Sequence, residues 1–268
     1  MCGIAGLLSP RGVEEGVLAA MNASLAHRGP DDNGLWLAPD PGIPGGRATV
    51  GLAQRRLSIV DLSPLGHNPM PRAGGRLCIT YNGEVYNFQA LRTELEALGE
   101  CFRSQSDTEV VLAAYDRWGP ACLGRFVGMF AFGLWDAPKK RLFLARDRLG
   151  KKPLYYARYA GRFAFASELK AFLQDPEFPR EIDAEALSLY LRFGYVPAPF
   201  SIYRAARKLS HAACCSLKTF NRAEVFRHFD SALPKGLGNR QRNLRLLRRQ
   251  NPRAAMKPRD LRTERAVC

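Results

Sequence analysis

FVGMFAFGLWDAPKKRLFLARDRLGKKPLYYARYAGRFAFA occupies residues 126–166 and contains a series of strand-like segments. The apolar runs lie at 126–135, 141–145, 154–157 and 162–166. Turn-forming residues such as DAPKK at 136–140 separate them, which is typical of short strands joined by tight turns. Many short strands, with helices gathered at few places, predict an α+β domain with layered, largely antiparallel sheets.

The rest of the chain extends this pattern on both sides. We expect further strands at 2–8, 48–53, 57–61 and 76–81. The spacing of apolar residues predicts helices at 12–26, 88–98, 107–117 and 183–193. Ser167 has the character of an N-cap and predicts a helix through Leu173. Segments rich in Pro, Gly and Asp predict loops at 27–32 and 39–46 and a linker at 174–181.

Length and composition bound the class of protein. A chain of 268 residues holds one or two domains of about 150 residues each. Its 46% hydrophobic and 24% charged residues are ordinary for a globular protein, which excludes a fibrous or wholly disordered chain. The longest apolar run, 126–135, is shorter than the roughly 20 residues that a membrane span needs. No basic segment precedes an apolar one at the N-terminus, so we expect a cytoplasmic protein without a signal peptide.

Cysteine usage argues against a zinc site and a disulfide framework. The chain has seven cysteines, an odd number, and no Cys-x-x-Cys pair. A zinc site or a disulfide framework is therefore not expected. Most of the cysteines are expected to be small buried hydrophobic residues. The cysteines are at 2, 78, 101, 122, 214, 215 and 268.

The positive charge of the chain is concentrated in its last residues. Residues 231–268 hold 11 Lys and Arg against 2 Asp and Glu, a net charge of +9 out of the total of +15. A nucleic-acid footprint needs a basic face on a folded domain or a dedicated basic arm. We do not expect nucleic acid as a partner, although a nucleic-acid-binding tail stays an alternative. Because this segment has few aliphatic residues, it cannot bury enough surface to fold, and we expect disorder.

Cys2 is the first candidate for chemistry. Its small side chain permits removal of Met1, which leaves one residue with both a thiol and a free α-amine. An amine with a pKa of about 8 can accept the proton of the thiol at neutral pH. The alternative is a cysteine that lies beside the start codon by chance.

Three further segments carry polar groups that can bind or polarise a substrate. In YNGEVYN at 81–87, Asn-Gly after a strand is typical of a tight turn. The same pair can instead form an oxyanion hole from the Asn82 amide and the Gly83 N–H. In the segment 54–61, one of the two arginines can bind a carboxylate in bidentate fashion. In SDTE at 106–109, Ser106 and Glu109 fit a capping box, and Asp107 fits either the first helical turn or an ammonium site.

Taken together, eight segments along the chain, in the order in which they occur, resemble the segments of one protein family. They are MCGIAG at 1–6, HRGPD at 27–31, RLSIVDLS at 56–63, YNGEVYN at 81–87, SDTEV at 106–110, GMFAFGLWD at 128–136, ARDRLGKKPLYY at 145–156 and FASELKA at 165–171. They resemble the class II glutamine amidotransferase domain of glutamine-hydrolysing asparagine synthetases, over roughly residues 2–209. Each segment alone is weakly specific, whereas the whole series in one order is highly specific.

The resemblance implies a fold and a site. The fold is a four-layer αββα sandwich of the N-terminal nucleophile (Ntn) hydrolase type. Cys2 is implied as the nucleophile that hydrolyses glutamine, and Asn82 and Gly83 as the oxyanion hole. Arg56 is implied to bind the substrate carboxylate, and Asp107 with Glu84 its ammonium. The residues implied to line the same pocket are Leu57, Ser58, Ile59 and Val60.

The resemblance also sets expectations for domains and cofactors. Residues 2–180 are expected to be the amidotransferase domain, and 181–209 a linker with a short helical remnant of a synthetase domain. Residues 210–268 are expected to lie outside the family, as a disordered tail or out-of-frame sequence of a truncated gene. Glutamine hydrolysis needs no cofactor, and no metal is expected. ATP and Mg belong only to the family's synthetase domain, whose Ser-Gly-Gly-x-Asp-Ser loop we do not find in this sequence.

Several alternatives stay open from the sequence. The chain is expected to be the glutaminase half of an enzyme of asparagine biosynthesis, with a synthetase domain in trans or a homodimer as partner and no membrane association. An inactive fragment or an interaction module is a second reading, since apolar surface at 187–203 has no predicted cover. The glutaminase half of another amidotransferase is a third. Position 54 is Gln where the family often has His, and we do not expect this change to abolish activity.

Overall fold

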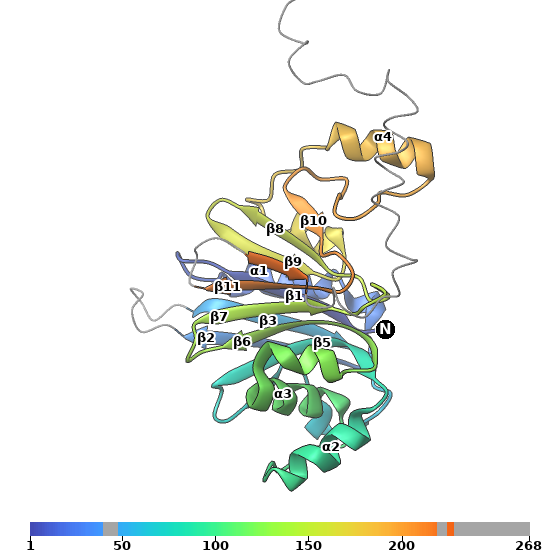
Figure 1. Cartoon of the computed structure of the whole chain (residues 1–268). Coiled ribbons are helices and arrows are strands. Elements are labelled where there is room, and N and C mark those ends of the chain that lie inside the picture. Colours follow the sequence, from blue (N-terminus) through green and yellow to red (C-terminus); the bar gives the residue numbers. More distant parts are fainter. Residues whose placement is uncertain (40–47, 219–223, 228–268) are drawn as a thin grey trace, which may run out of the picture. The chain divides into compact units, whose positions relative to one another are not determined.

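Two six-stranded antiparallel sheets face each other in the computed structural model, which describes residues 1–39, 48–218 and 224–227 (Figure 1). In the order of pairing, the first sheet contains β10 (Ala206–Lys208), β8 (Tyr155–Tyr159), β9 (Arg162–Ala166), β1 (Gly3–Leu8), β3 (Ala48–Arg56) and β2 (Asp32–Pro39). The second contains β12 (Glu224–Arg227), β11 (Ala213–Lys218), β7 (Arg141–Arg146), β6 (Gly128–Asp136), β5 (Leu77–Val85) and β4 (Met70–Arg72).

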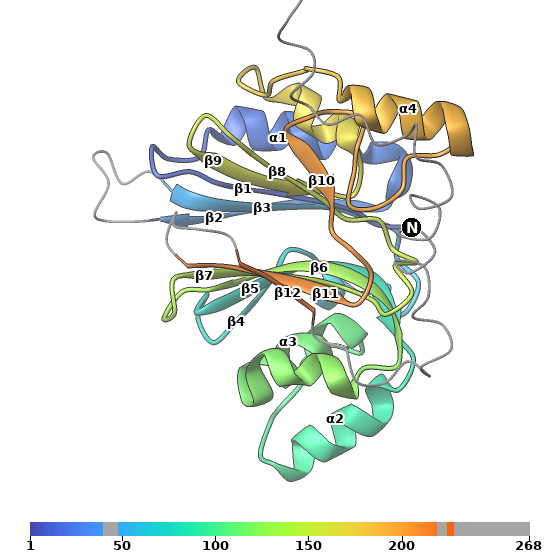
Figure 2. The ribbon, with the colours of Figure 1, turned by 45° about the horizontal axis from the view of Figure 1, so that its top comes forward.

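Helices cover the outer faces of both sheets. The α-helices are α1 (Glu15–Ala23), α2 (Phe88–Ala97), α3 (Asp107–Trp118) and α4 (Ala184–Phe193). The short 3₁₀ segments are η1 (Ala26–Arg28), η2 (Pro64–Gly66), η3 (Gly119–Arg125) and η4 (Leu169–Gln174). In Figure 2, α1 lies outside the first sheet and α3 outside the second, with α2 beyond α3. The four-layer αββα sandwich predicted from the sequence is therefore confirmed.

The space between the sheets is filled by apolar side chains from both. Phe165 on β9 is fully buried there. Its ring lies so close to two glycines that a Cβ would come within 2.2 Å of it at Gly6 and within 2.3 Å at Gly133. Gly6 belongs to the first sheet and Gly133 to the second. Glycine at these two positions thus lets a large ring occupy the middle of the sandwich at close packing.

The prediction of strands was correct for the central strands and wrong after the end of β3 and at the end of β5. The strand expected at 57–61 is absent, because β3 ends at Arg56 and residues 57–61 form no strand. The strand expected at 76–81 continues to Val85, so Asn82 and Gly83 lie inside β5, opposite Ala131 and Phe130. The tight turn that Asn-Gly suggested is therefore not formed. β2 and β4 were not predicted.

One helix start and one capping box differ from expectation. Ser167 is no N-cap: its hydroxyl accepts a 3.0 Å hydrogen bond from Ile4 N and its N–H donates to Ile4 O, so it extends the pairing with β1. Ser106 does cap α3, accepting from Thr108 N at 3.1 Å. Glu109, however, accepts from Arg103 N and Ser104 N and does not complete a capping box.

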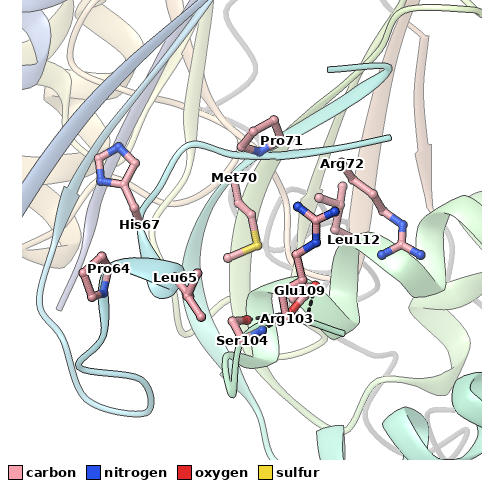
Figure 3. Close-up of a pocket in the computed structure, with 10 residues that line it drawn as sticks. All are labelled: Pro64, Leu65, His67, Met70, Pro71, Arg72, Arg103, Ser104, Glu109 and Leu112. Carbon is pink, nitrogen blue, oxygen red and sulfur yellow. Dashed lines mark hydrogen bonds between the residues drawn. The ribbon is translucent and has the colours of Figure 1, made fainter. Parts of the chain in front are cut away.

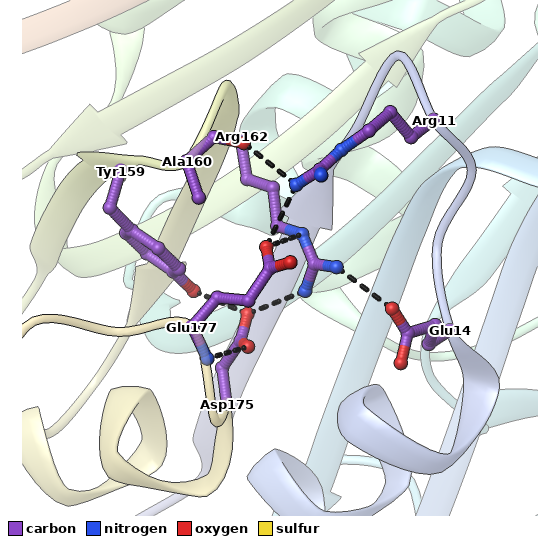
Figure 4. Close-up of polar contacts among 7 residues, drawn as sticks. All are labelled: Arg11, Glu14, Tyr159, Ala160, Arg162, Asp175 and Glu177. Atoms are coloured by element: carbon purple, nitrogen blue, oxygen red, sulfur yellow. Dashed lines mark hydrogen bonds and ion pairs between the residues drawn. The ribbon is translucent and has the colours of Figure 1, made fainter.

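An arginine fastens the expected linker at 174–181 to the first sheet (Figure 4). The Arg162 side chain is 5% exposed and forms ion pairs with Asp175 at 2.9 Å, Glu177 at 3.0 Å and Glu14 at 2.8 Å. Tyr159 Oη also donates to Asp175 Oδ2 at 2.8 Å. Because three carboxylates bind one guanidinium, and one of these carboxylates also accepts from a phenol, the segment after η4 is held in place before α4 begins.

The folded part of the chain extends further past Leu209 than the sequence indicated. β11 pairs with β7 in register, with Cys214 opposite Ala145 and Cys215 opposite Leu144, and both cysteines are buried. The disorder expected from residue 210 is therefore wrong for Ala213–Lys218 and for Glu224–Arg227, the strand β12 that pairs with β11. The rest of that expectation, at 219–223 and 228–268, lies outside the described residues, as does most of the loop expected at 39–46.

Candidate functional site

Cys2 lies at the N-terminal end of β1, the inner strand between β9 and β3. The pairing of Gly3 with Arg55 places Cys2 beside the end of β3. There, Leu57 N donates to Cys2 Sγ at 3.4 Å, and Sγ lies 3.7 Å from Leu57 O. The thiol is therefore held against the first residue that follows β3.

Arg28 holds the other side of Cys2. Its Nε donates to Cys2 O at 3.0 Å, and its Nη1 forms a 2.7 Å ion pair with Glu168 Oε1. The Arg28 side chain is only 10% exposed. Sequence reasoning missed this role of Arg28, for which its place in the HRGPD segment was the only signal. Arg28 of η1 thus anchors the main-chain carbonyl of Cys2, and Glu168, just before η4, holds Arg28 in turn.

Asn82 and Gly83 lie on β5, which approaches β1 across the sandwich. Asn82 is 1% exposed, and its Nδ2 is buried without a hydrogen-bond partner among the described residues. A buried amide donor without a partner costs about 1–3 kcal/mol, so it marks a place where an acceptor fits. At Gly83 a Cβ would lie 2.6 Å from Met129 O, which leaves room for no other residue.

Asp107 is the first residue of α3 and is almost fully buried. Its Oδ2 accepts hydrogen bonds from Tyr81 Oη at 2.8 Å and from Val85 N at 3.0 Å. Burial raises the pKa of Asp107, and the nearby Glu84 carboxylate raises it further, while these two hydrogen bonds oppose the shift. A buried carboxylate with a second one nearby forms a local negative region that favours a cation.

The Tyr81 phenol donates to Asp107 and feels the charges of further groups of the site. Burial raises the pKa of Tyr81 well above its ordinary value, and negative charge at Asp107, Cys2 and Glu84 raises it further. These residues come from three elements distant in sequence: the start of β1, the end of β5 and the start of α3. The structure thus brings together the predicted thiol and the predicted ammonium site.

Arg56 ends β3 and is 8% exposed. Its Nη2 donates to the main-chain oxygen of Asp61, and its guanidinium lies directly against Gly66. The loop between these contacts, residues 57–60, carries exposed apolar side chains, with Ile59 73% and Val60 41% exposed. Ser58 N is held by Asp31 Oδ2 at 2.8 Å. Arg56 thus fixes the loop that follows it.

Gln54 occupies the position where the resemblance leads one to expect histidine. It is 1% exposed, and its Oε1 accepts from Tyr81 N at 2.8 Å and from Thr80 Oγ1 at 3.0 Å. The side chain therefore joins β3 of the first sheet to β5 of the second, behind the site. Its contacts are structural and reach none of the predicted substrate-binding groups.

No group of three or more His, Cys, Asp or Glu side chains within residues 1–39, 48–218 and 224–227 could hold a metal ion. His27 lies 3.0 Å from Glu168, and His67 lies 2.8 Å from Asp32. Each of these two histidines thus has a carboxylate partner. Over the same described ranges, no helix is long and apolar enough to cross a bilayer.

The αββα sandwich, with a cysteine just before an inner strand, is the fold type of the N-terminal nucleophile hydrolases. Within that class, the chain belongs to the glutamine amidotransferase domain family, whose sequence profile matches residues 1–228. The match continues past Leu209, where we expected the resemblance to end. It includes β11, which the structure places in the second sheet.

Two bacterial relatives are named as asparagine synthetases. A putative glutamine-hydrolysing asparagine synthetase of Mycobacterium tuberculosis is 38% identical over 245 residues, covering 85% of this chain and 37% of that protein. Glutamine-hydrolysing asparagine synthetase 3 of Bacillus subtilis is 35% identical over 244 residues, covering 86% of this chain and 38% of that protein. The chain thus spans less than two fifths of the length of these relatives.

A solved structure supports the fold independently. The glutamine phosphoribosylpyrophosphate amidotransferase of B. subtilis, complexed with ADP and GMP, superposes with a TM-score of 0.62 at 18% identity. The superposition covers 86% of this chain and 50% of that one. At this identity the likeness concerns the fold alone.

Proposed function

We propose that this chain hydrolyses the side-chain amide of glutamine to glutamate and ammonia, with Cys2 as the nucleophile. The observation that carries the proposal is the Asn82 amide nitrogen, a buried donor without a partner, among the described residues, on the strand that approaches β1. Such a donor fits an oxygen that becomes negatively charged during attack by the thiol. Family membership and the asparagine synthetase relatives support the same reaction.

The first step requires removal of Met1. Met1 is 57% exposed and thus accessible to an aminopeptidase. The freed α-amine of Cys2 accepts the thiol proton, and the thiolate attacks the amide carbon of glutamine. The carbonyl oxygen takes the electron pair and becomes an oxyanion. Asn82 Nδ2 and the Gly83 N–H stabilise this oxyanion by donating hydrogen bonds.

The second step releases both products. As the oxyanion collapses, the ammonium of Cys2 protonates the departing nitrogen, and ammonia leaves a glutamyl thioester. The amine then takes a proton from water, whose oxygen attacks the thioester carbon through the same oxyanion hole. Collapse of this second intermediate regenerates the thiol and frees glutamate.

The two ends of glutamine are bound by opposite charges. The Arg56 guanidinium binds the α-carboxylate, because it is the cation at the edge of the loop against which Cys2 lies. Asp107, with Glu84, binds the α-ammonium, which compensates the burial that raises the pKa of Asp107. Residues 57–60 line the pocket between them.

The ammonia would pass to a synthetase-type partner. The relatives named as asparagine synthetases are longer than this chain, so we propose that a synthetase domain accepts the ammonia, either in the same polypeptide or in trans. ATP and Mg would serve that domain and take no part in glutamine hydrolysis. A cytoplasmic location and a homodimer are further proposals.

A substrate comparison tests the proposal. Purified protein is incubated with glutamine, asparagine or glutamate γ-methyl ester, and amino-acid and ammonia products are quantified. We expect equal amounts of glutamate and ammonia from glutamine, glutamate from the ester, and no product from asparagine, whose shorter side chain does not reach Cys2. Equal turnover of asparagine, or none of glutamine, would contradict the proposal.

A further inference from the structure

We propose that Asp61 is a positioning residue that fixes the spacing between Arg56 and the start of α3, and thereby sets the affinity for glutamine. This inference rests on the proposed function, because Arg56 and Asp107 are the groups proposed to bind the two ends of the substrate. Asp61 touches neither end itself. Its effect is transmitted through the loop that follows β3.

The contacts of Asp61 reach both sides of the site. On one side, its main-chain oxygen accepts from Arg56 Nη2. On the other, its Oδ2 accepts a 2.9 Å hydrogen bond from Gln105 N. Its Oδ1 accepts from Ser63 N at 2.8 Å and from Ser63 Oγ at 2.6 Å. The residue is 7% exposed, so these bonds are largely shielded from water.

The Gln105 contact leads directly to the proposed ammonium site. Gln105 precedes the N-cap Ser106, and Asp107 follows as the first residue of α3. Asp107 is itself fixed by Tyr81 and Val85. Since Asp107 lies only two positions after Gln105, a bond that holds Gln105 N also holds the main chain that carries the ammonium-binding carboxylate.

A cavity beside this contact gives the loop room to move when the contact is absent (Figure 3). It has a volume of about 250 Å³ and lies between η2 and the start of α3. Leu65 belongs to one wall and Ser104 to the other, with Met70 and Leu112 also lining it. The Asp61–Gln105 hydrogen bond joins these two walls, because Asp61 precedes η2 and Gln105 follows Ser104.

A carboxylate is the side chain that this position requires. Every partner of its two oxygens is a donor: Gln105 N, Ser63 N and Ser63 Oγ. An asparagine would turn its NH₂ toward one of these donors, so either the Ser63 side or the Gln105 side would be lost. Hydrogen bonds to a charged group are stronger than those between neutral groups, which suits a carboxylate that has to hold a loop.

The test compares Asp61→Asn and Gln105→Pro with Gln105→Ala. Proline removes the Gln105 N–H, while alanine keeps it and changes only the exposed side chain. For each protein, kcat/KM is measured for glutamine. Inhibition constants are measured for glutaramate, which lacks the ammonium, and for 4-aminobutanamide, which lacks the carboxylate.

We expect Asp61→Asn and Gln105→Pro to lower kcat/KM for glutamine about tenfold, mainly through KM, because one such bond is worth about a factor of ten. The inhibition constants of the two one-ended ligands should change less than about twofold, since neither depends on the spacing between Arg56 and Asp107. Gln105→Ala should match the wild type.

Equal weakening of glutamine and of both one-ended ligands in Asp61→Asn and Gln105→Pro would show a general loss of structure and overturn the inference. Unchanged glutamine kinetics in both variants would overturn it as well. If Asp61→Asn does not fold, Gln105→Pro decides alone. Absence of glutaminase activity in the wild type would instead reject the proposed function, which keeps the two failures distinguishable.

Discussion

Tyr81 Oη donates a 2.8 Å hydrogen bond to Asp107 Oδ2, which joins β5 of the second sheet to the first turn of α3. The phenol is buried, and the same carboxylate oxygen is held by Val85 N. The proposed ammonium-binding carboxylate is thus oriented by a neutral donor that stays protonated, because burial and the surrounding negative groups raise the pKa of Tyr81 far above neutrality.

Tyr81→Phe removes this donor and retains the ring. A hydrogen bond to a charged group is worth about 1.5–3 kcal/mol, so we expect KM for glutamine to rise about tenfold or more. Because the nucleophile and the oxyanion hole are untouched, kcat should change less than about threefold. Steady-state kinetics measure both constants. A fall in kcat with unchanged KM would contradict the proposed role of Asp107.

The pH dependence of KM follows from the raised pKa of Asp107. Since this carboxyl in the folded protein binds a proton at a pH where an ordinary Asp is ionised, it becomes neutral at a pH above the usual value of 3.8. A neutral carboxyl attracts an ammonium weakly, so KM for glutamine should rise as pH falls through that raised pKa. Tyr81→Phe should move this rise to higher pH, because the lost hydrogen bond had lowered the pKa.

KM measured from about pH 8 downward in a constant-ionic-strength buffer tests this dependence, with the fold checked by circular dichroism at each point. A KM that stays flat until the protein unfolds would show that ionisation of Asp107 does not contribute to glutamine binding. A rise that Tyr81→Phe leaves at the same pH would assign the titration to another group.

Gly83→Ala tests the close packing behind the oxyanion hole. The added methyl would meet Met129 O at 2.6 Å and Phe130 Cα at 2.7 Å, both parts of the β6 main chain. We expect a loss of about 1–3 kcal/mol in the free energy of unfolding, together with loss of glutaminase activity. Chemical denaturation and glutamate release measure the two effects.

Gly16→Ala is the matched control for that variant. Gly16 lies in α1, and a Cβ there meets no atom within 4 Å. Alanine is the better helix former by about 1 kcal/mol, so this change should leave activity intact and preserve or raise stability. Equal destabilisation by the two variants would refute the packing argument at Gly83.

Phe165→Ala tests the centre of the sandwich. Removing a fully buried phenylalanine costs about 3–5 kcal/mol, more so where glycines on both sides cannot fill the space. Urea denaturation should show this loss at an unchanged slope. Val127→Ala, at a side chain that is 56% exposed, should change stability by less than about 0.5 kcal/mol. A loss below about 1 kcal/mol for Phe165→Ala would contradict close packing of this ring between the two sheets.

Features whose signal is local could be predicted from the sequence. Ser106 indicates the start of α3, which fixes where Asp107 lies. The role of Cys2 stays a prediction, because it depends on the removal of Met1. The alternation of short apolar runs predicted the layered sheets, because strand periodicity is itself local. The capping by Ser106 is confirmed by the structure.

Groups that act through contacts distant in sequence could not be predicted. Arg28, Gln54 and Asp61 each bond to a group at least five residues away, and nothing in their own neighbourhood indicates the partner. The segment 57–61 has strand-like composition, yet polar contacts at Ser58 and Asp61 hold it as a loop. β11 was missed because the resemblance to the family was taken to end near Leu209, and no strand was therefore expected beyond it.

The most direct measurement of the central claim is glutamate release by the wild type and by Cys2→Ala, with intact-mass analysis of both proteins. We expect a wild type that begins at Cys2 and releases glutamate, a Cys2→Ala variant that folds but releases none, and a transient mass increase matching a glutamyl thioester in the wild type alone. Glutamate release that persists in Cys2→Ala, or a folded wild type that begins at Cys2 and is inactive, would contradict the assignment of Cys2 as the nucleophile.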